Sequence, residues 1–305
     1  MHDVIIIGAG PAGYTAGIYC ARARHDTLLI SGILPGGQLM NTTDVENYPG
    51  FSDGIMGPDL MAVMRKQTEK MGTKIIDDEV TSVDFKNRPL KVKTASEEFE
   101  ARAVIVCTGA NPRKIGLEGE QTFAGKGVSY CATCDGAFFR DQELIVVGGG
   151  DSAMEEATFL TKFASVVHIV HRKEEFRASK IMQERALSNE KIKVHFNSAV
   201  KEIHGDQKFQ QVVLNNTKTN EDKILEAGGL FIAIGHEPNS AIFQDQIELD
   251  RNGYMIIKNN TETSVTGVFC AGDVHDHMYR QAVTAAGFGC MAAIDVDKYL
   301  SESNT

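Results

Sequence analysis

The sequence predicts an α/β protein that contains two parallel sheets. Two segments share one pattern: a short apolar strand, a glycine turn and a helix that begins with small residues. They are DVIIIGAGPAGYTAGIYCAR at residues 3–22 and ELIVVGGGDSAMEEATFLTK at residues 143–162. A second apolar strand follows each segment, DTLLI at 26–30 and VVHIV at 166–170. Because a strand, a helix and a second strand in this order form a parallel unit, the chain should contain two such units.

Both glycine turns have the spacing expected of a dinucleotide site. The first is Gly8-Ala9-Gly10-Pro11-Ala12-Gly13 and the second is Gly148-Gly149-Gly150-Asp151-Ser152-Ala153. One match to G-x-G-x-x-G/A is weak evidence, but two copies that follow a strand and open a helix are much stronger. Glycine lets the backbone approach a pyrophosphate, and the helix N-terminus supplies N–H donors. A turn without a ligand is the alternative, and the repetition disfavours it.

Three further apolar strands lead into glycine turns. They lie in AVIVCTGA at 103–110, GLFIAIGHEPN at 229–239 and GVFCAGDV at 267–274. Two segments, KTNEDKIL and DRNGYMII, are typical of hairpin turns. The chain of 305 residues is long enough for about two domains.

Charge and hydropathy exclude several classes of partner. The formal net charge of -10 disfavours nucleic acid, which binds to basic surfaces. We expect no membrane partner, because no segment is long and apolar enough to span a bilayer. The N-terminal apolar run is shorter than that of a signal peptide. A cytoplasmic protein is therefore expected.

The ends of the second strands indicate which cofactors the two sites take. In the first segment this strand ends at Ser31-Gly32, without the usual acidic residue that accepts hydrogen bonds from the ribose hydroxyls. In the second segment it ends at His171-Arg172-Lys173, and Arg177 follows four residues later. These cations suit the 2′-phosphate of NADP. A solvated basic stretch is the alternative, since HRKEEFR also contains two glutamates. The first site should then bind FAD, because a flavin can pass electrons from NADPH to a disulfide.

Cys131 and Cys134 form a CxxC motif in SYCATCDGAFF, with Asp135 directly behind. A zinc site needs four ligands, and no second pair or histidine lies at ligand spacing, so we expect no metal. A static disulfide is disfavoured in a reducing compartment. A redox-active dithiol is the remaining interpretation. The other four cysteines lie in apolar patterns and are expected to be buried; they are Cys20, Cys107, Cys270 and Cys290.

These features together resemble the low-molecular-weight thioredoxin reductases over nearly the whole chain. The motifs that carry the resemblance are GAGPAGYTA, PGGQL, TTDVENYPGF, CATCDG, GGGDSAMEEA, HRKEEFRAS, AIGHEPN, GVFCAGDV and YRQAVTAAGFGCMAA. The resemblance implies two Rossmann-like dinucleotide-binding domains, with the NADPH domain inserted into the FAD domain. The FAD domain would comprise residues 1–112 and 245–305, and the NADPH domain, which carries the CxxC, residues 113–244. It also implies a homodimer.

The resemblance assigns residues to each cofactor. Those expected at FAD are Gly8, Ala9, Gly10, Pro11, Ala12, Gly13, Ser31, Gly37, Gln38, Asn47, Thr108, Gly109, Asp273, Arg280, Gln281 and Ala282. Those expected at NADPH are Gly150, Asp151, Ser152, Ala153, His171, Arg172, Lys173 and Arg177. Two positions depart from the family. Leu34 stands where some members have a glutamate near the ribose, and Lys173 stands where many have arginine, which would relax discrimination against NADH.

The implied reaction is that of an NADPH-dependent thioredoxin-disulfide reductase. A hydride passes from NADPH to FAD, electrons pass to the Cys131–Cys134 disulfide, and the dithiol reduces a thioredoxin-like protein by thiol–disulfide exchange. Cys134 would face the flavin, Cys131 would attack the partner, and Asp135 would be the acid/base, or alternatively a helix N-cap. One dithiol cannot meet flavin and a protein in a single arrangement, so we expect the inserted domain to rotate.

Three other functions fit parts of the pattern. A ferredoxin-driven reductase should lack the NADP motifs GGGDSA and HRKEEFR, which this chain has. A flavin-binding redox sensor is disfavoured by the intact CATCDG. A small-molecule dithiol oxidase is not separated from a thioredoxin reductase by the CxxC motif alone.

Overall fold

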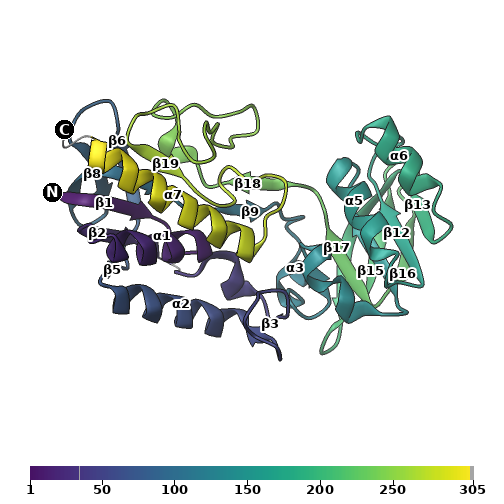
Figure 1. Ribbon diagram of the computed structural model, residues 1–305. Helices are drawn as coiled ribbons and strands as arrows, with labels where there is room; N and C mark the ends of the chain where they lie inside the picture. The colour runs from purple at the N-terminus through teal and green to yellow at the C-terminus, as the bar shows by residue number, and fades with distance from the viewer. Residues whose placement is uncertain (34, 303–305) are drawn as a thin grey trace. The chain divides into compact units, whose positions relative to one another are not determined.

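The computed structural model describes residues 1–33 and 35–302 and divides into two compact units. The first unit comprises residues 1–111 and the C-terminal residues from 237 on, and the second comprises residues 112–236. In Figure 1 the purple and yellow segments build the first unit and the teal segments build the second. The first division lies one residue from the predicted boundary at 112–113. The second division, between residues 236 and 237, precedes the predicted boundary at 244–245. The reason is that Phe243 stacks on Phe85 of the first unit, with ring centroids 6.2 Å apart.

A seven-stranded sheet forms the centre of the first unit. Its order is β5-β2-β1-β8-β7-β6, and β19 also pairs with β8. The strands β5, β2, β1, β8 and β19 run parallel, whereas β7 pairs antiparallel with both β8 and β6. Their bounds are β1 His2–Ile7, β2 Thr27–Ile30, β5 Lys74–Ile76, β6 Val80–Asp84, β7 Leu90–Thr94, β8 Glu98–Val106 and β19 Val268–Cys270.

Helices cover one face of this sheet. Figure 1 shows α1 (Pro11–Arg22) and α7 (Ala282–Glu302) side by side, with α2 (Gly57–Met71) next to α1. Alternate residues of a strand point to opposite faces. Accordingly, Val4 and Ile6 pack in the helix-covered core, and Ile5 and Ile7 pack in a second core with Phe243. The unit also contains η1 Gly37–Asn41, the strand pair β3 Asp44–Val45 and β4 Ile55–Met56, and η3 Ala241–Phe243.

The second unit has a five-stranded parallel sheet and a three-stranded antiparallel sheet. The parallel order is β10-β17-β11-β12-β13 and the antiparallel order is β14-β15-β16. Their bounds are β10 Val128–Ser129, β11 Glu143–Val147, β12 Val166–Val170, β13 Ile192–His195, β14 Ser198–Gly205, β15 Phe209–Asn216, β16 Asp222–Glu226 and β17 Gly229–Ile232. The helices are α3 Glu118–Thr122, α4 Ala132–Asp135, η2 Gly136–Phe139, α5 Asp151–Leu160 and α6 Lys180–Leu187.

Where the chain passes between the units, β9 (Ala110–Pro112) pairs with β18 (His236–Pro238). The predicted α/β fold is confirmed, and so is each strand–turn–helix–strand segment, but the sheet of the first unit also contains antiparallel pairs. The hairpin expected around KTNEDKIL joins β15 and β16. The one expected around DRNGYMII is a turn closed by a single bridge between Leu249 and Met255, not by two strands.

Candidate active site

In the first glycine turn, two glycines are required by packing and one faces open space. Gly8 has φ +108°, and a Cβ there would lie 2.4 Å from the carbonyl oxygen of Cys107. A Cβ on Gly13 would lie 1.9 Å from the carbonyl oxygen of Gly8. A Cβ on Gly10 would meet no heavy atom within 4 Å in the described part of the chain. Gly10 therefore leaves room for a ligand at the start of α1.

The second turn divides its glycines in the same way. A Cβ on Gly148 would lie 2.4 Å from the carbonyl oxygen of Ala233, and one on Gly149 would lie 2.3 Å from the His171 ring. A Cβ on Gly150 has no described heavy atom within 4 Å. Neither α1 nor α5 has a side chain that caps its N-terminus among the residues described, so their first N–H groups are available to an anion.

Segments from distant parts of the sequence gather around the first turn. Gly36 N–H donates to the Ala9 carbonyl oxygen (2.9 Å), which brings the loop with Gly37 beside the turn. A Cβ on Gly272 would lie 3.0 Å from the Ala12 Cβ, so the loop that carries Asp273 lies against α1. Within the described chain, Asp273 Oδ1 is buried without a hydrogen-bond partner. Burial, with Asp276 nearby, raises the pKa of Asp273 to about 7.

Ser31, at the end of β2, does have an acidic neighbour. Its hydroxyl donates to Asp77 Oδ1 (2.7 Å), and Arg65 donates to both oxygens of Asp77 (2.8 and 3.0 Å). Arg65 and Ser31 lower the pKa of Asp77. Sequence reasoning missed this carboxylate because it follows β5, the neighbour of β2 in the sheet, and not β2 itself. Leu34 lies outside the described residues.

Four more of the residues expected at FAD form hydrogen bonds with distant parts of the chain. Thr108 donates to the Asn239 carbonyl oxygen (2.7 Å), and the Gly109 carbonyl oxygen accepts from Asn239 N–H (2.9 Å). Gln38 donates to Asn111 (2.7 Å), and Asn47 donates to Gln281 (3.3 Å).

Arg280 and Ala282 lie in one loop that leads into α7. Arg280 has φ +47° and donates to the His277 carbonyl oxygen (2.6 Å), and Ala282 begins α7. Asp276 accepts from the backbone N–H groups of three residues in this loop, at 2.9 to 3.2 Å. Neither Asn239 nor Asp276 was predicted as a site residue. Asn239 bonds Thr108 and Asn111, which are 131 and 128 positions away, and Asp276 bonds backbone N–H groups that only the folded loop brings close.

The basic loop after β12 is attached to the second glycine turn. The backbone N–H groups of Arg177 and Ala178 both donate to the Gly149 carbonyl oxygen, at 2.7 and 3.1 Å. Arg172, Lys173 and Arg177 are exposed. The loop thus presents three cations next to the open position at Gly150, which suits a phosphate.

His171 and Asp151 support this arrangement from within. His171 is buried, and burial together with the nearby cations lowers its pKa. Its Nε2 pairs with the Glu175 carbonyl oxygen at 3.0 Å. Asp151 Oδ1 accepts from the backbone N–H (2.8 Å) and hydroxyl (2.9 Å) of Ser179. Asp151 therefore ties the start of α5 to the start of α6, next to Ser152 and Ala153 of the same turn.

Cys131 and Cys134 are joined by a disulfide with Cα atoms 5.3 Å apart. Cys131 is the N-cap of α4, and its Sγ accepts from Cys134 N–H at 3.2 Å. Cys134 is exposed and Cys131 is partly exposed. Of the other cysteines, Cys20, Cys107 and Cys270 are buried as expected, whereas Cys290 is only partly buried.

Asp135 is the last residue of α4 and lies in the same turn as the disulfide. It is partly buried. Burial raises its pKa, and a hydrogen bond with Ser129 opposes that shift. Although Asp135 occupies the N-cap position of η2, its side chain makes no capping hydrogen bond within the described chain. The helix-cap alternative therefore has no support, and a carboxyl with a raised pKa suits acid/base work.

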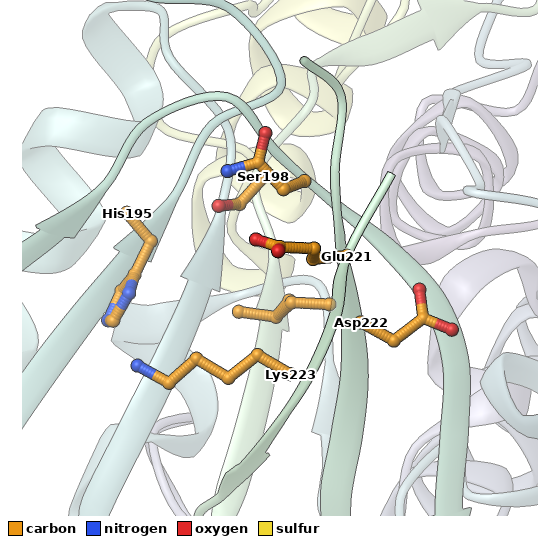
Figure 2. Close-up of a pocket in the computed structure, with 7 residues that line it drawn as sticks. His195, Ser198, Glu221, Asp222 and Lys223 are labelled. Atoms are coloured by element: carbon orange, nitrogen blue, oxygen red, sulfur yellow. The ribbon is translucent and has the colours of Figure 1, made fainter. Parts of the chain in front are cut away.

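A pocket of about 530 Å³ lies elsewhere in the second unit, beside β13 to β16 (Figure 2). Its lining residues are His195, Ser198, Leu214, Asn216, Glu221, Asp222 and Lys223. His195 Nε2 pairs with His168 (3.0 Å), and burial lowers its pKa to about 4, so it is uncharged near neutral pH. The pocket holds none of the predicted site residues.

Residues 1–33 and 35–302 contain neither a metal-binding cluster nor a membrane-spanning helix. No group of three or more histidine, cysteine or acidic side chains is arranged to hold a metal ion. No described helix has the length and apolar character needed to cross a bilayer.

Comparison with known proteins agrees with this geometry. The profile of the pyridine nucleotide-disulphide oxidoreductase family matches residues 2–289. Thioredoxin reductase from Streptomyces clavuligerus is 54% identical over 307 residues, covering 99% of this chain and 94% of that protein. The one from Mycolicibacterium smegmatis is 52% identical, covering 100% and 98%. The structure of thioredoxin reductase from Giardia duodenalis superimposes with a TM-score of 0.95 at 43% identity, covering 98% and 99%. The chain therefore belongs to the pyridine nucleotide-disulphide oxidoreductase family, among the thioredoxin reductases.

Proposed function

We propose that this chain transfers reducing equivalents from NADPH, through FAD and the Cys131–Cys134 disulfide, to the disulfide of a thioredoxin or thioredoxin-like protein. The observation that carries the proposal is the disulfide at Cys131 and Cys134, with the carboxyl of Asp135 in the same helical turn. The net reaction converts NADPH, a proton and a protein disulfide to NADP⁺ and a protein dithiol. Each step moves one electron pair, so no further oxidant or reductant is needed.

Family membership implies a flavin and a pyridine nucleotide as cofactors. We assign FAD to the first unit. Gly10 offers the open backbone that a pyrophosphate needs, and Asp273 presents a buried carboxyl oxygen suited to a hydroxyl of the flavin's sugar-like chain. The remaining contacts are assigned to Gly8, Ala9, Pro11, Ala12, Gly13, Ser31, Gly37, Gln38, Asn47, Thr108, Gly109, Arg280, Gln281 and Ala282. When bound, the flavin supplies two-electron transfer between a nicotinamide and a disulfide.

We assign NADPH to the second unit. Gly150 would admit the pyrophosphate, and Arg172, Lys173 and Arg177 would surround the 2′-phosphate. Asp151, Ser152, Ala153 and His171 complete the set. Lys173 offers a point charge where an arginine would offer two parallel donors, so we expect a preference for NADPH that is less than absolute.

The dithiol chemistry falls to three side chains. Reduction of the disulfide leaves one thiol on each cysteine, and the thiolate of Cys131 attacks the protein disulfide to form a mixed disulfide. Cys134, which we assign to the flavin side, then releases the product. Asp135 would take up and return the proton, because a carboxyl with a raised pKa exchanges protons closer to neutral pH. One dithiol has to serve a flavin and a bulky protein, and we therefore propose that the second unit rotates relative to the first.

We further propose a homodimer and a cytoplasmic location. The exposed face of α7 carries Val283, Met291 and Ile294, and Tyr19 of the adjacent α1 is also exposed. Such a row of apolar side chains suits the interface of a symmetric dimer. A cytoplasmic location suits an enzyme that keeps protein thiols reduced.

The test is NADPH oxidation with and without oxidised thioredoxin. Oxidation that depends on thioredoxin in the wild type, and is lost in both Cys131→Ser and Cys134→Ser, supports the proposal. Cys134→Ser should also retain thioredoxin as a covalent adduct when the thioredoxin lacks its own resolving cysteine and its remaining cysteine carries thionitrobenzoate as a mixed disulfide, because Cys131 attacks that disulfide and the small thiolate leaves. Oxidation that requires a small disulfide and ignores thioredoxin would instead identify a small-molecule dithiol enzyme.

A further inference from the structure

Three side-chain amides of the first unit form a continuous chain of hydrogen bonds. Gln38 Nε2 donates to Asn111 Oδ1 at 2.7 Å, and Asn111 Nδ2 donates to Asn239 Oδ1 at 2.9 Å. Asn239 Nδ2 then donates to the backbone carbonyl oxygen of Thr108 at 2.9 Å. The amides come from η1, from β9 and from the residue after β18. The chain thus joins Gln38 and Thr108, which we assign to FAD, through two asparagines that have no assigned role.

The chain is anchored at its Asn239 end. The backbone N–H of Asn239 donates to the Gly109 carbonyl oxygen at 2.9 Å. The Thr108 hydroxyl donates to the Asn239 carbonyl oxygen at 2.7 Å. Together with the side-chain bond to Thr108, these contacts attach Asn239 to residues 108–109 by three hydrogen bonds. The amide of Asn239 therefore extends from a backbone that is itself fixed.

The carbonyl group at the anchored end sets the direction of every bond in the chain. A carbonyl oxygen only accepts, so Asn239 must turn its NH₂ group toward Thr108 and its oxygen toward Asn111. Asn111 must then donate to Asn239 and accept from Gln38. The Gln38 NH₂ group faces Asn111, and within the described residues the Gln38 side-chain oxygen has no hydrogen-bond partner. The free end of the chain is therefore an acceptor.

We propose that Asn111 and Asn239 are positioning residues that hold Gln38 as a hydrogen-bond acceptor for FAD. All three amides are exposed, so a bound ligand can reach the free oxygen. FAD offers matching donors, because its ring carries an N–H group and its sugar-like chain carries hydroxyls. The inference rests on the proposed function, which assigns Gln38 to FAD. Asn111 and Asn239 act through Gln38.

The test is a double-substitution cycle on the flavin-loaded full chain. Each protein is diluted stepwise, and the released FAD is measured by its fluorescence to obtain Kd. Asn239→Ala removes the hold on Asn111 and should weaken FAD binding by about 3- to 10-fold. Gln38→Glu keeps an acceptor for FAD but places a carboxylate oxygen against the Asn111 oxygen, which cannot turn away while Asn239 holds it. Gln38→Glu should therefore weaken binding as well.

The decisive result is the effect of Asn239→Ala in the Gln38→Glu background. Without the Asn239 amide, Asn111 is free to turn and donate its NH₂ group to the introduced carboxylate. The substitution that weakens FAD binding in the wild type should therefore tighten it by about 3- to 10-fold in this background. The added negative charge is present in both proteins of this second pair, so it does not affect the comparison.

One control and one alternative variant protect the test. Asn87→Ala removes an exposed amide that donates to Asp84 (2.9 Å) in the same unit, and it should leave FAD affinity unchanged in both backgrounds. If Asn239→Ala does not fold, Asn111→Ala carries the same prediction. It releases Gln38 in the wild type, and it removes the oxygen that opposes the carboxylate in the Gln38→Glu background.

The inference is overturned if Asn239→Ala leaves FAD affinity unchanged in the wild type, or if it fails to tighten binding in the Gln38→Glu background. FAD release requires neither NADPH nor thioredoxin. A wild-type protein that binds FAD and fails to reduce thioredoxin would overturn the proposed function, while the cycle would still decide the roles of Asn111 and Asn239.

Discussion

The parallel strands of the two units have the same order, but different chemical groups follow the outer strand. In the first unit the order is β5-β2-β1-β8-β19, and in the second it is β13-β12-β11-β17-β10. Each glycine turn follows the central strand, β1 or β11. The outer strand next to β8 or β17 leads to Asp273 in one unit and to Cys131 in the other. Equivalent strand ends thus carry a carboxyl that suits a flavin in one unit and a redox cysteine in the other.

The two units share the features that the fold requires and differ in those that the chemistry requires. Carboxyl ends of parallel strands meet at one edge of a sheet, which is where open α/β sheets bind ligands. In both units the glycine turn lies at that edge, and a Cβ on one glycine of each turn, Gly10 or Gly150, would meet no described heavy atom within 4 Å. The two units differ in the residues after the second strand, where Ser31 pairs with Asp77 in one and three cations stand in the other. We therefore propose that cofactor choice depends on these residues and not on the glycines.

We expect the largest effect from substitutions at the last position of the G-x-G-x-x-G/A motif in each turn. The first unit has Gly13 and the second has Ala153. A Cβ on Gly13 would lie 1.9 Å from the Gly8 carbonyl oxygen, so Gly13→Ala must displace backbone. We expect it to lower the free energy of unfolding by about 3 kcal/mol or more. The reciprocal change, Ala153→Gly, should cost about 1 kcal/mol. Urea unfolding of both variants measures the difference, and equal losses would show that the two turns pack alike.

The next effect concerns ligand binding without loss of folding. Gly10 and Gly150 have negative φ, and a Cβ on either meets no described atom within 4 Å, so valine should be accommodated at both. We expect Gly10→Val to prevent flavin binding, which leaves the protein colourless. Gly150→Val should keep the yellow colour and raise KM for NADPH by about 10-fold or more, because the side chain takes the place of the pyrophosphate. Absorbance near the flavin bands and steady-state kinetics test this. A colourless Gly150→Val protein would reverse the assignment of the two sites.

A smaller effect should distinguish the residues after the second strand. Arg172→Ala combined with Arg177→Ala removes two exposed cations from the second site. A charge-assisted hydrogen bond to phosphate contributes about 1.5–3 kcal/mol, so KM for NADPH should rise about 10- to 100-fold. KM for NADH should change little, since NADH lacks the 2′-phosphate. Lys173→Arg is the matched control and should sharpen the preference for NADPH. Equal losses for both nucleotides would show that the cluster does not recognise this phosphate.

Most of the fold could be predicted from local patterns, whereas part of the site could not. The strands and helices around both turns follow from hydrophobic runs and glycine spacing, which are properties of neighbouring residues. The strand β10 has only two residues and no such pattern, so its place beside β17 was not predicted. Asp77 contacts Ser31 across 46 positions, and Asn239 contacts Thr108 across 131. Such contacts arise only when the sheet brings separate segments together.

The last effect depends on pH and concerns Asp273, the carboxyl at the end of the outer strand of the first unit. Burial raises the pKa of Asp273 from 3.8 to about 7, and Asp276 adds to the shift. A folded-state pKa above the unfolded value means that the native protein holds the proton more tightly than the unfolded chain. The stability from this group is therefore complete below about pH 4 and is lost as the pH rises through about 7.

Asparagine imitates the protonated acid, so Asp273→Asn should remove this pH dependence. In flavin-free protein, we expect the variant to be up to about 4 kcal/mol more stable than the wild type above pH 7, and equal to it near pH 4, because each unit of pKa shift corresponds to about 1.4 kcal/mol. Urea unfolding at the two pH values measures both differences. The matched change in the second unit is Asp135→Asn, where Ser129 opposes the effect of burial, so a smaller gain is expected there. If Asp273→Asn stabilises the protein equally at both pH values, the carboxyl does not titrate between them. The stability gain would then come from packing and not from the charge.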